Sequence, residues 1–413
     1  MASIIKRSEN NYSVVYYYTN NNGAKKQKWE AFATLKAAQK RKAEVEYLTL
    51  NGRLKVNDVT TLNELLTEYI DIHGESKWSV STYHKYCKTL NKYVRPFIGE
   101  MELQQITARS MGIFYKQLAN GKMGVSVTIK MIKEINKILR SAFNYAIRLD
   151  LMEKNPLEYT NFPKTETAER NIWNMTELDC ALSHCQDSML YLMINLIIAG
   201  SLRVGELLAL TWDCVLITED SILNGSSYIL VNKTLERVNR EAMQNLKDRD
   251  ILYKFPPEKS VQQTVVVLKT PKTASSVRKI YLPVTVSKLL LKHRKDIENT
   301  KLLLGHEYMD HNLVCASWNG MPLSPRYIND GLHRLSKEAN VPDITSHGLR
   351  HSSITLKLRM SGGDIKAVQG DSGHAQAKMV TDLYAHIVDE DRRKTAELFE
   401  ELFYKKRGDD KET

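Results

Sequence analysis

Tyr384 is a residue whose type and setting could do chemistry, because it follows a Gly373-His374 pair and lies on a predicted helix. A phenol oxygen can act as a nucleophile, and a histidine can manage its proton. From Val380, apolar residues recur at Leu383, Tyr384 and Ile387, which is the spacing of one helix face. A tyrosine on such a stripe is more often a core residue, so this segment alone favours the core.

Arg203 could also do chemistry, because it is predicted to lie at the start of a helix. An apolar helix is expected to end at Gly200, and Ser201 can cap the next helix, which places Arg203 in its first turn. The unpaired backbone amides and the positive dipole there favour an anion, and Glu206 one turn later can orient the guanidinium. A surface ion pair between Arg203 and Glu206 would leave the same pattern.

Residues 345–356 combine a histidine with an arginine on one predicted helix. His347 and Arg350 are three residues apart and therefore share one face, which suits a polar site. Another face carries the packing residues Leu349, Ser353 and Leu356. His347 and His351 could instead bind zinc, but the metalloprotease motif needs a glutamate where this chain has Gly348.

Lys272 lies between two predicted strands, at 264–269 and 277–282. We expect these strands to pair as a hairpin with Lys272 in its turn. A lysine in an exposed turn is usually only a solubilising residue, so the turn by itself does not indicate chemistry.

These residues follow one another in an order that resembles the tyrosine recombinase (lambda-type phage integrase) family, in particular the integrases of conjugative transposons and Gram-positive phages. The resemblance covers nearly the whole chain, and the matched positions are Arg203, Lys272, His347, Arg350, His374 and Tyr384. The Pro-Lys-Thr pattern before Ser-x-Arg is similar to the hairpin that carries the family's lysine. The chain departs from common family residues, without touching a matched position, at Gly348 (often aspartate), Ser372 (usually leucine) and Tyr281 (commonly proline).

The resemblance implies a site-specific DNA recombinase (integrase) that integrates and excises a mobile element through a 3′-phosphotyrosyl intermediate. Tyr384 would be the nucleophile, and Arg203 and Arg350 would neutralise the non-bridging phosphate oxygens. Two guanidinium groups match phosphate geometry and let such a site work without a metal, so neither a metal nor a cofactor is expected.

His347 and His374 would, by the same resemblance, hydrogen-bond the phosphate or manage the tyrosine proton. Lys272 would be the general acid that protonates the leaving 5′ oxygen. Two other functions remain compatible with the residues: a relaxing topoisomerase that uses the same side chains, and a catalytically silent DNA-binding regulator.

The charge balance favours a polyanionic partner. The chain has 413 residues, enough for two or three domains, and 59 Lys and Arg against 48 Asp and Glu give it a formal net charge of +11. Five cysteines form no CxxC pair and indicate neither a disulfide framework nor a zinc cluster. The longest apolar run, 189–199, is too short to span a bilayer. We therefore expect a soluble bacterial protein of the cytoplasm, associated with the nucleoid when bound to DNA and without a membrane partner.

The amino-terminal region is predicted to be a small sheet followed by a helix. Strands are expected at 12–18 and 24–32 around an Asn-Asn-Gly turn, with a helix from Leu35. Lys25, Lys26 and Lys28 lie beside Trp29, as a sheet against DNA would require, although an exposed hairpin kept soluble by lysines fits equally well. The resemblance implies three strands and a helix here, in an arm-type DNA-binding domain of residues 1–55.

The next region is predicted to be wholly helical, with Thr61 capping a helix at 62–72 and further helices at 82–97, 107–118 and 126–151. On the last helix an apolar face lies opposite a basic sector formed by Lys130, Lys133, Lys137 and Arg140. DNA contact and a solvated charged face explain this sector equally well. The resemblance implies a SAM-like core-binding domain of residues 56–163.

The remaining residues, 170–413, are predicted to form a mainly helical catalytic domain with a small antiparallel sheet, so the expected architecture is the multidomain tyrosine recombinase fold. Asn155-Pro156 ends the preceding domain, and a capping box from Thr176 to Asp179 is expected to start the first catalytic-domain helix. An excursion at 234–261 has no functional assignment. The run 395–406 is amphipathic and is expected to pack on its own domain or on a neighbour.

The partners implied by the resemblance are double-stranded DNA with core-type and arm-type sites and further copies of the same chain, as a tetramer on DNA. Accessory factors of such enzymes are an excisionase and a host DNA-bending protein.

Overall fold

The computed structural model describes residues 2–8, 11–19, 25–51, 59–121, 124, 127–160, 162, 171–257, 262–271, 273–373 and 396–401. It contains two compact units, residues 1–165 and 166–413. The finer division into domains of residues 1–55, 56–163 and 170–413 stays a prediction.

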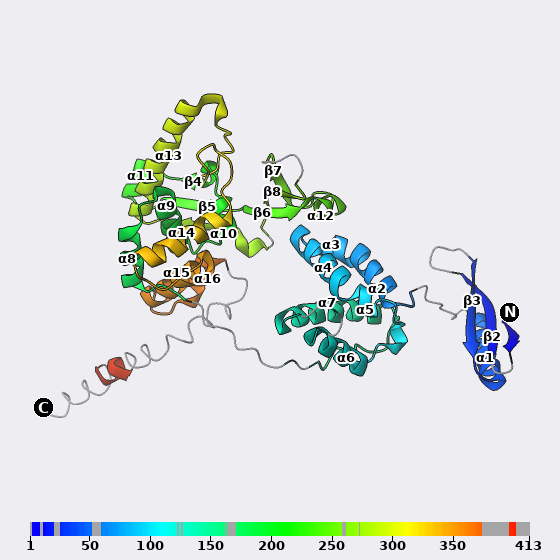
Figure 1. The fold of residues 1–413 in the computed structure, drawn as a ribbon. Helices are drawn as coiled ribbons and strands as arrows, with labels where there is room; N and C mark the ends of the chain where they lie inside the picture. Colours follow the sequence, from blue (N-terminus) through cyan, green and yellow to red (C-terminus); the bar gives the residue numbers. More distant parts are fainter. Residues whose placement is uncertain are drawn as a thin grey trace. The chain divides into compact units, whose positions relative to one another are not determined.

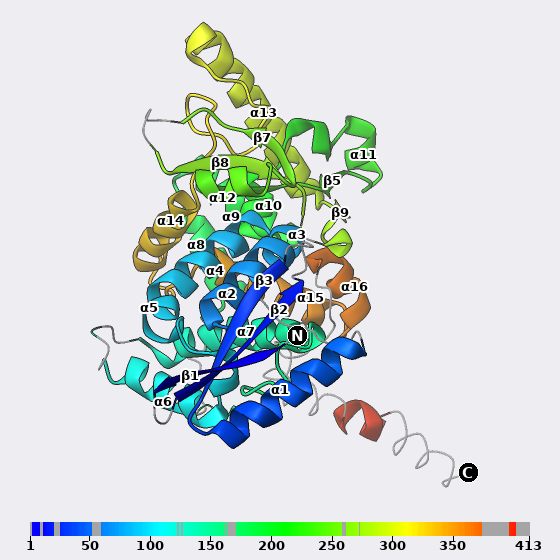
Figure 2. The same cartoon turned by 90° about the vertical axis from the view of Figure 1, so that its right-hand side faces the viewer.

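The first unit begins with a three-stranded antiparallel sheet in the order β1-β2-β3. Its strands are β1 (Ser3–Ser8), β2 (Asn11–Thr19) and β3 (Lys25–Phe32). Helix α1 (Leu35–Leu50), capped by Thr34, packs on one face of the sheet (Figures 1 and 2). The two have a small core of their own that contains Val14, Tyr16, Ala38 and Val45. The strands and helix predicted from the residues are confirmed, whereas only the resemblance predicts β1.

The rest of the first unit consists of helices. They are α2 (Leu62–Glu68), the π-helical turn η1 (Tyr69–Gly74), α3 (Glu75–Lys77), α4 (Val80–Tyr93), α5 (Arg95–Ile98), the 3₁₀ turn η2 (Leu103–Gln105), α6 (Ala108–Ala119) and α7 (Ile129–Arg148). Thr61 caps α2 through a reciprocal capping box with Glu64, so this predicted cap is confirmed.

Helix α7 has the two faces that its sequence predicts. Its apolar face packs against α2, α4 and α6 and buries Ile132, Ile135, Leu139, Phe143 and Ala146. On the other side Lys130, Lys137 and Arg140 are exposed, and Lys133 is half-buried. Such a wide apolar stripe holds the helix in the bundle and leaves its basic sector at the surface.

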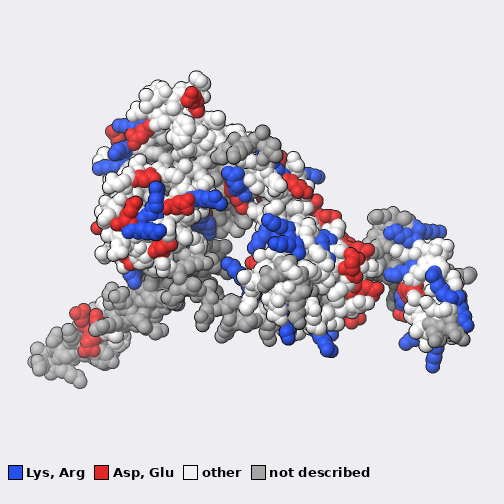
Figure 3. All heavy atoms as spheres, in the orientation of Figure 1, with Lys and Arg blue, Asp and Glu red and all other residues white. Residues whose placement is uncertain are grey.

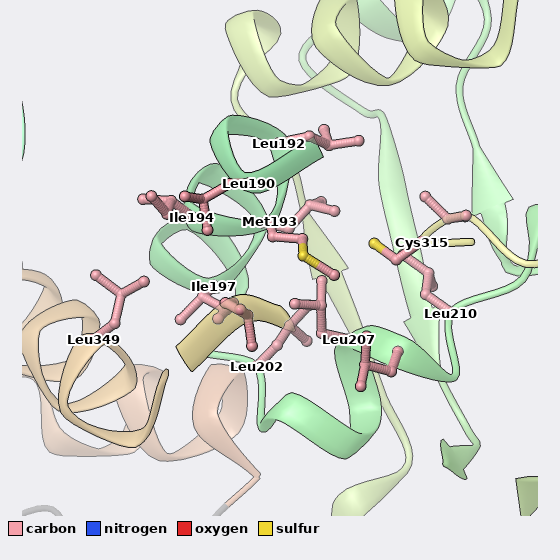
Figure 4. Close-up of a cluster of buried hydrophobic side chains, with 14 of the residues drawn as sticks. Leu190, Leu192, Met193, Ile194, Ile197, Leu202, Leu207, Leu210, Cys315 and Leu349 are labelled. Carbon is pink, nitrogen blue, oxygen red and sulfur yellow. The ribbon is translucent and has the colours of Figure 1, made fainter. Parts of the chain in front are cut away.

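The second unit is built around α9 (Ser188–Gly200), which is apolar on nearly every side and is therefore buried. Figure 4 shows side chains of α9 among those of the surrounding elements, with Leu190, Met193, Ile194 and Ile197 near Leu202, Leu207 and Leu349. Helices α10 (Val204–Leu208), α13 (Val284–Leu304), α14 (Pro325–Glu338) and α15 (Ser346–Met360) all contact α9. No helix in the described ranges is both long enough and apolar enough to cross a membrane.

The other helices of this unit are shorter. They are α8 (Met175–His184), α11 (Glu219–Leu223), α12 (Arg240–Asn245) and α16 (Ile365–Ser372), with the 3₁₀ turns η3 (Trp212–Cys214), η4 (Ala274–Ser276) and η5 (Gly305–Glu307). The predicted capping box at Thr176 is wrong, because Asn174 caps α8 and exchanges hydrogen bonds with Glu177. Of the amphipathic run at 395–406, the described residues 396–401 are helical, and Leu398 and Phe399 are about half exposed.

Two small antiparallel sheets complete the second unit. One has the order β4-β5-β9 and contains β4 (Val215–Leu216), β5 (Tyr228–Val231) and β9 (Arg278–Tyr281). The other has the order β6-β8-β7 and contains β6 (Thr234–Asn239), β8 (Thr264–Lys269) and β7 (Ile251–Lys254). The excursion at 234–261 thus supplies two strands of the second sheet.

The predicted hairpin between the strands at 264–269 and 277–282 is wrong. Strand β8 pairs with β6 on one side and β7 on the other, so both of its edges are occupied, and β9 pairs with β5 instead. The connection that contains Lys272 therefore joins two different sheets. Lys272 itself lies outside the described residues.

Candidate active site

The end of α9 determines where Arg203 lies. Ser201 adopts a left-handed conformation (φ 47°) at the carboxyl end of α9, and Arg203 is the N-cap residue of α10. The expectations that Ser201 caps α10 and that Arg203 lies within its first turn are therefore wrong. The Ser201 hydroxyl is instead hydrogen-bonded to the hydroxyl of Ser353 on α15 (2.7 Å), which ties α9 to that helix.

Glu206 orients Arg203, as predicted. The Arg203 Nη1 donates to Glu206 Oε1 (2.7 Å), and the Arg203 backbone amide donates to Glu206 Oε2 (3.0 Å). Glu206 is only 7% exposed, so the two residues do not form an ordinary surface ion pair. The Arg203 side chain, in contrast, is 40% exposed. The guanidinium of Arg203 is thus held from its buried side and remains accessible to a ligand.

Arg350 approaches the same carboxylate from α15 and is almost completely buried, with 1% exposure. Its Nη1 donates to the Ser201 carbonyl, its Nη2 donates to the Ser372 carbonyl (2.7 Å), and Nη1 lies 3.9 Å from Glu206 Oε2. Burial, followed by the nearby charge of Arg203, lowers the pKa of Arg350 to about 9, so it remains charged at neutral pH.

His347 lies in the first turn of α15, which Thr345 caps through the amide of Gly348. His347 is exposed, and its ring meets that of His351 edge to face with centroids 4.3 Å apart. A Cβ added at Gly348 would lie 2.8 Å from the Asn171 carbonyl oxygen. The departure from aspartate at this position therefore has a steric reason, because the backbone of residue 171 occupies the space.

Arg278 is a buried member of this cluster that sequence reasoning missed. It lies on β9, is 8% exposed, and its Nη2 donates to Glu206 Oε2 (2.8 Å). The available signal was the alternation of the strand, since Arg278 and Ile280 face inward while Lys279 and Tyr281 are exposed. An arginine at an inward position needs a buried partner, and Glu206 is that partner.

Glu206 is therefore the carboxylate that three arginines share. Burial alone would raise the pKa of its carboxyl, but hydrogen bonds and charge from Arg278 and Arg203 outweigh burial and hold this pKa below its usual range. Removing one member of such a buried pair typically costs about 3–5 kcal/mol, because the other charge is left uncompensated.

The carboxyl end of α16 closes the cluster. Gly373 ends this helix in the left-handed region (φ 63°), and its carbonyl accepts a hydrogen bond from Arg203 Nη2 (3.2 Å). His374 follows directly in the sequence. His374 and Tyr384, like Lys272, lie outside the described residues, so of the predicted site residues the structure brings together Arg203 and Arg350 and places His347 on the helix of Arg350.

The basic residues predicted on β3 do not share one face. Lys26 is paired with Tyr18 and Lys28 with Tyr16, on the side of the sheet that α1 covers. Lys25 lies on the open side with Trp29, whose ring is covered by the Arg7 guanidinium at 4.7 Å. Figure 3 accordingly shows basic side chains at several places around the domain of β1–β3 and α1.

Two families match parts of this chain. Residues 259–391 match the family described as the phage integrase family, and residues 61–119 match the phage integrase N-terminal SAM-like domain. The first range contains Arg278, His347 and Arg350, and the second lies in the helical part of the first unit.

Several curated relatives align over most of their length. The chain is 23% identical to the XerC-like tyrosine recombinase of Caldanaerobacter subterraneus subsp. tengcongensis, over 90% of both chains. It is 23% identical to the integrase of Staphylococcus phage L54a, over 83% of this chain and 94% of that one. It is 22% identical to the ICEBs1 integrase of Bacillus subtilis, over 76% of each.

Solved structures of similar fold include the Tn1549 transposon integrase in complex with circular intermediate DNA, with a TM-score of 0.62 and 20% identity over 82% of this chain and 99% of that one. A lambda integrase tetramer bound to a Holliday junction has a TM-score of 0.50 and 17% identity over 92% of this chain and 94% of that one. These likenesses confirm the predicted fold class.

Proposed function

This chain belongs to the tyrosine recombinase (phage integrase) family, and we propose that it is a site-specific DNA recombinase that integrates and excises a mobile element. Both family matches and relatives aligned over most of their length support this function. A silent DNA-binding regulator and a relaxing topoisomerase are not favoured, because the relatives are named recombinases and integrases.

The observation that most directly supports the proposal is the convergence of Arg203 and Arg350 on Glu206 and on the end of α16. In phosphoryl transfer, negative charge spreads over the non-bridging oxygens, and prepositioned guanidinium groups stabilise it. The shared carboxylate fixes both arginines before DNA binds, so little reorganisation is needed during the reaction.

The proposed reaction begins with attack of the Tyr384 oxygen on the phosphorus. A 3′-phosphotyrosyl bond forms as the bond to the 5′ oxygen breaks, and Lys272 supplies the proton to that oxygen. His347 and His374 hydrogen-bond the phosphate or manage the tyrosine proton. The 5′ hydroxyl of a partner strand then attacks the phosphotyrosyl bond, which releases Tyr384 and reseals the DNA without ATP.

The proposed partners are double-stranded DNA and further copies of this chain. A lambda integrase dimer is known on a core site and a tetramer on a Holliday junction. By likeness, we expect this chain to act as a homo-oligomer, with a tetramer on paired core-type sites. An excisionase and a host DNA-bending protein are the accessory factors we propose for directionality.

Two basic surfaces are proposed to contact DNA. On the amino-terminal sheet the open face presents Lys25 and Trp29, and Lys26 and Lys28 can reach the DNA backbone along β3 because β3 is an edge strand. On α7 the exposed sector is formed by Lys130, Lys133, Lys137 and Arg140. Positive side chains on two separate elements suit arm-type and core-type sites respectively.

The proposed function predicts a covalent protein–DNA adduct. The protein is incubated with nicked DNA that spans the junction of the element encoding it, and the mixture is separated on a denaturing gel. We expect a slowly migrating adduct that protease removes, because the nick lets the short fragment that carries the new 5′ hydroxyl diffuse away before it can reseal the strand. A protein that binds this DNA and never forms an adduct would be a regulator.

Removal of residues 1–55 should weaken assembly on full-length sites by about 10²-fold or more, with little effect on binding to a short core site. Two linked DNA-binding units gain affinity through effective concentration, and the deletion abolishes that gain. The sheet and α1 have their own core, so the deletion leaves the packing of α2–α7 intact. Gel-shift titrations on both DNAs measure the difference, and an equal loss on both would contradict a separate arm-site role.

A further inference from the structure

Three arginines donate to three consecutive carbonyls at the end of α16. Arg278 Nε donates to Asp371 (2.7 Å), Arg350 Nη2 donates to Ser372 (2.7 Å), and Arg203 Nη2 donates to Gly373 (3.2 Å). The last carbonyls of a helix have no partner within the helix and carry its negative dipole end, so they attract cations. The end of α16 is therefore held by the two arginines of the proposed phosphate site, Arg203 and Arg350, together with Arg278.

Arg278 differs from Arg203 in lying inside the protein, with a side-chain exposure of 6% against 40%. Besides Asp371 and Glu206, it donates from Nη1 to the carbonyl of Ser276 at the end of η4 (3.1 Å). Each of its three guanidinium nitrogens thus donates to a protein oxygen, so Arg278 is suited to hold other groups of the site in place. Its position links β9, α10 and α16.

Gly373 packs directly against the guanidinium of Arg278. A Cβ at this position would lie 2.9 Å from Arg278 Nη1 and 3.2 Å from its Cδ and Cζ. Together with the left-handed φ, this contact explains why the turn before His374 requires glycine. Arg278 thus supports the turn whose carbonyl accepts from Arg203.

We propose that Arg278 is a positioning residue of the recombinase site, which holds Arg203 in place through Glu206 and through the Gly373 turn. Both routes end on Arg203. In the first, Arg278 donates to Oε2 of Glu206 and Arg203 donates to Oε1 of the same carboxylate. In the second, Gly373 packs against Arg278, and its carbonyl accepts a hydrogen bond from Arg203. Without Arg278, only Arg203 and Arg350 would compensate the buried charge of Glu206. Both guanidinium groups would then be drawn toward this carboxylate and away from a bound phosphate.

The inference rests on the proposed function, and R278K is the variant that tests it. Lysine keeps the charge beside Glu206 but cannot bond the Asp371 carbonyl and the carboxylate together, because it lacks the planar fork of arginine. We expect R278K to lower the single-turnover cleavage rate on nicked site DNA by about 10²-fold, as small misplacements of positioned groups do. DNA affinity and the thermal unfolding midpoint should stay close to those of R294K, an exposed arginine on α13.

A double-mutant cycle with R203A separates positioning from a general structural role. If Arg278 acts through Arg203, adding R278K to R203A should leave the cleavage rate within about twofold of R203A alone. A further hundredfold loss in the double variant would overturn the proposal, as would a wild-type rate for R278K. Should R278K fail to fold, R278Q is used in the same cycle. All its cleavage rates are then measured at a lower assay temperature, equally far below the unfolding midpoint of each variant. The adduct formed by the wild-type protein is the reference, and its absence would contradict the proposed function. If the wild-type adduct forms but the losses in cleavage rate of R278K and R203A add up in the double variant, only this inference is contradicted.

Discussion

Tyr384→Phe is expected to bind site DNA with unchanged affinity and to form no covalent adduct. The substitution removes only the phenolic oxygen, while the ring can still fill the apolar face predicted around it. Since that oxygen is the proposed nucleophile, cleavage should fall below detection rather than to a reduced rate. Gel-shift titration measures the affinity, and denaturing gels with nicked site DNA measure the adduct.

Tyr327→Phe is the matched control, and it should form the adduct normally. The Tyr327 hydroxyl donates to Asp187 (2.7 Å), and burial together with this carboxylate raises the pKa of Tyr327, which makes it a poor nucleophile. An adduct that persists in Tyr384→Phe would show that another tyrosine attacks. Tyr404, which lies outside the described residues, would then be the next candidate.

Lys272→Ala is expected to lower the cleavage rate on normal DNA by about 10²–10⁴-fold, the usual contribution of a general acid, and to recover on DNA whose bridging 5′ oxygen is replaced by sulfur. A thiolate is a good leaving group without protonation, because the pKa of a thiol is about 8.5 and that of an alcohol is much higher. Single-turnover cleavage of both substrates by the wild-type protein and by the variant gives the ratio.

Arg203→Ala is the control for this experiment and should stay slow on both substrates. Its loss concerns charge on the non-bridging oxygens, which the sulfur leaves unchanged. Equal impairment of Lys272→Ala on both substrates would assign the acid to a different residue. Lys269, the nearest alternative in sequence, is 4% exposed and is paired with Glu236 within the β6–β8 pair, so it would have to leave that ion pair to act.

Local sequence patterns predicted much of the fold. The Thr61 capping box, the two faces of α7 and the end of α9 at Gly200 were all predictable, because each depends on residues within a few turns of one helix. The partnership of Arg203 with Glu206 is local in the same sense, since they are three residues apart. The order of motifs along the chain was sufficient to predict the family.

Strand pairing and the buried charge network were decided only by the tertiary structure. The sequence suggested that β8 would pair with the next strand, β9, but β8 is enclosed by β6 and β7, and β9 joins β5. Likewise Arg278 meets Glu206 and Asp371 across 72 and 93 residues of chain. Periodicity and caps report contacts along one element, whereas the choice of a strand partner or a counter-ion depends on which distant surfaces bury each other best. The sequence by itself therefore determined the helices, the order of the motifs and the family, while folding in three dimensions decided that Arg278 supports Arg203.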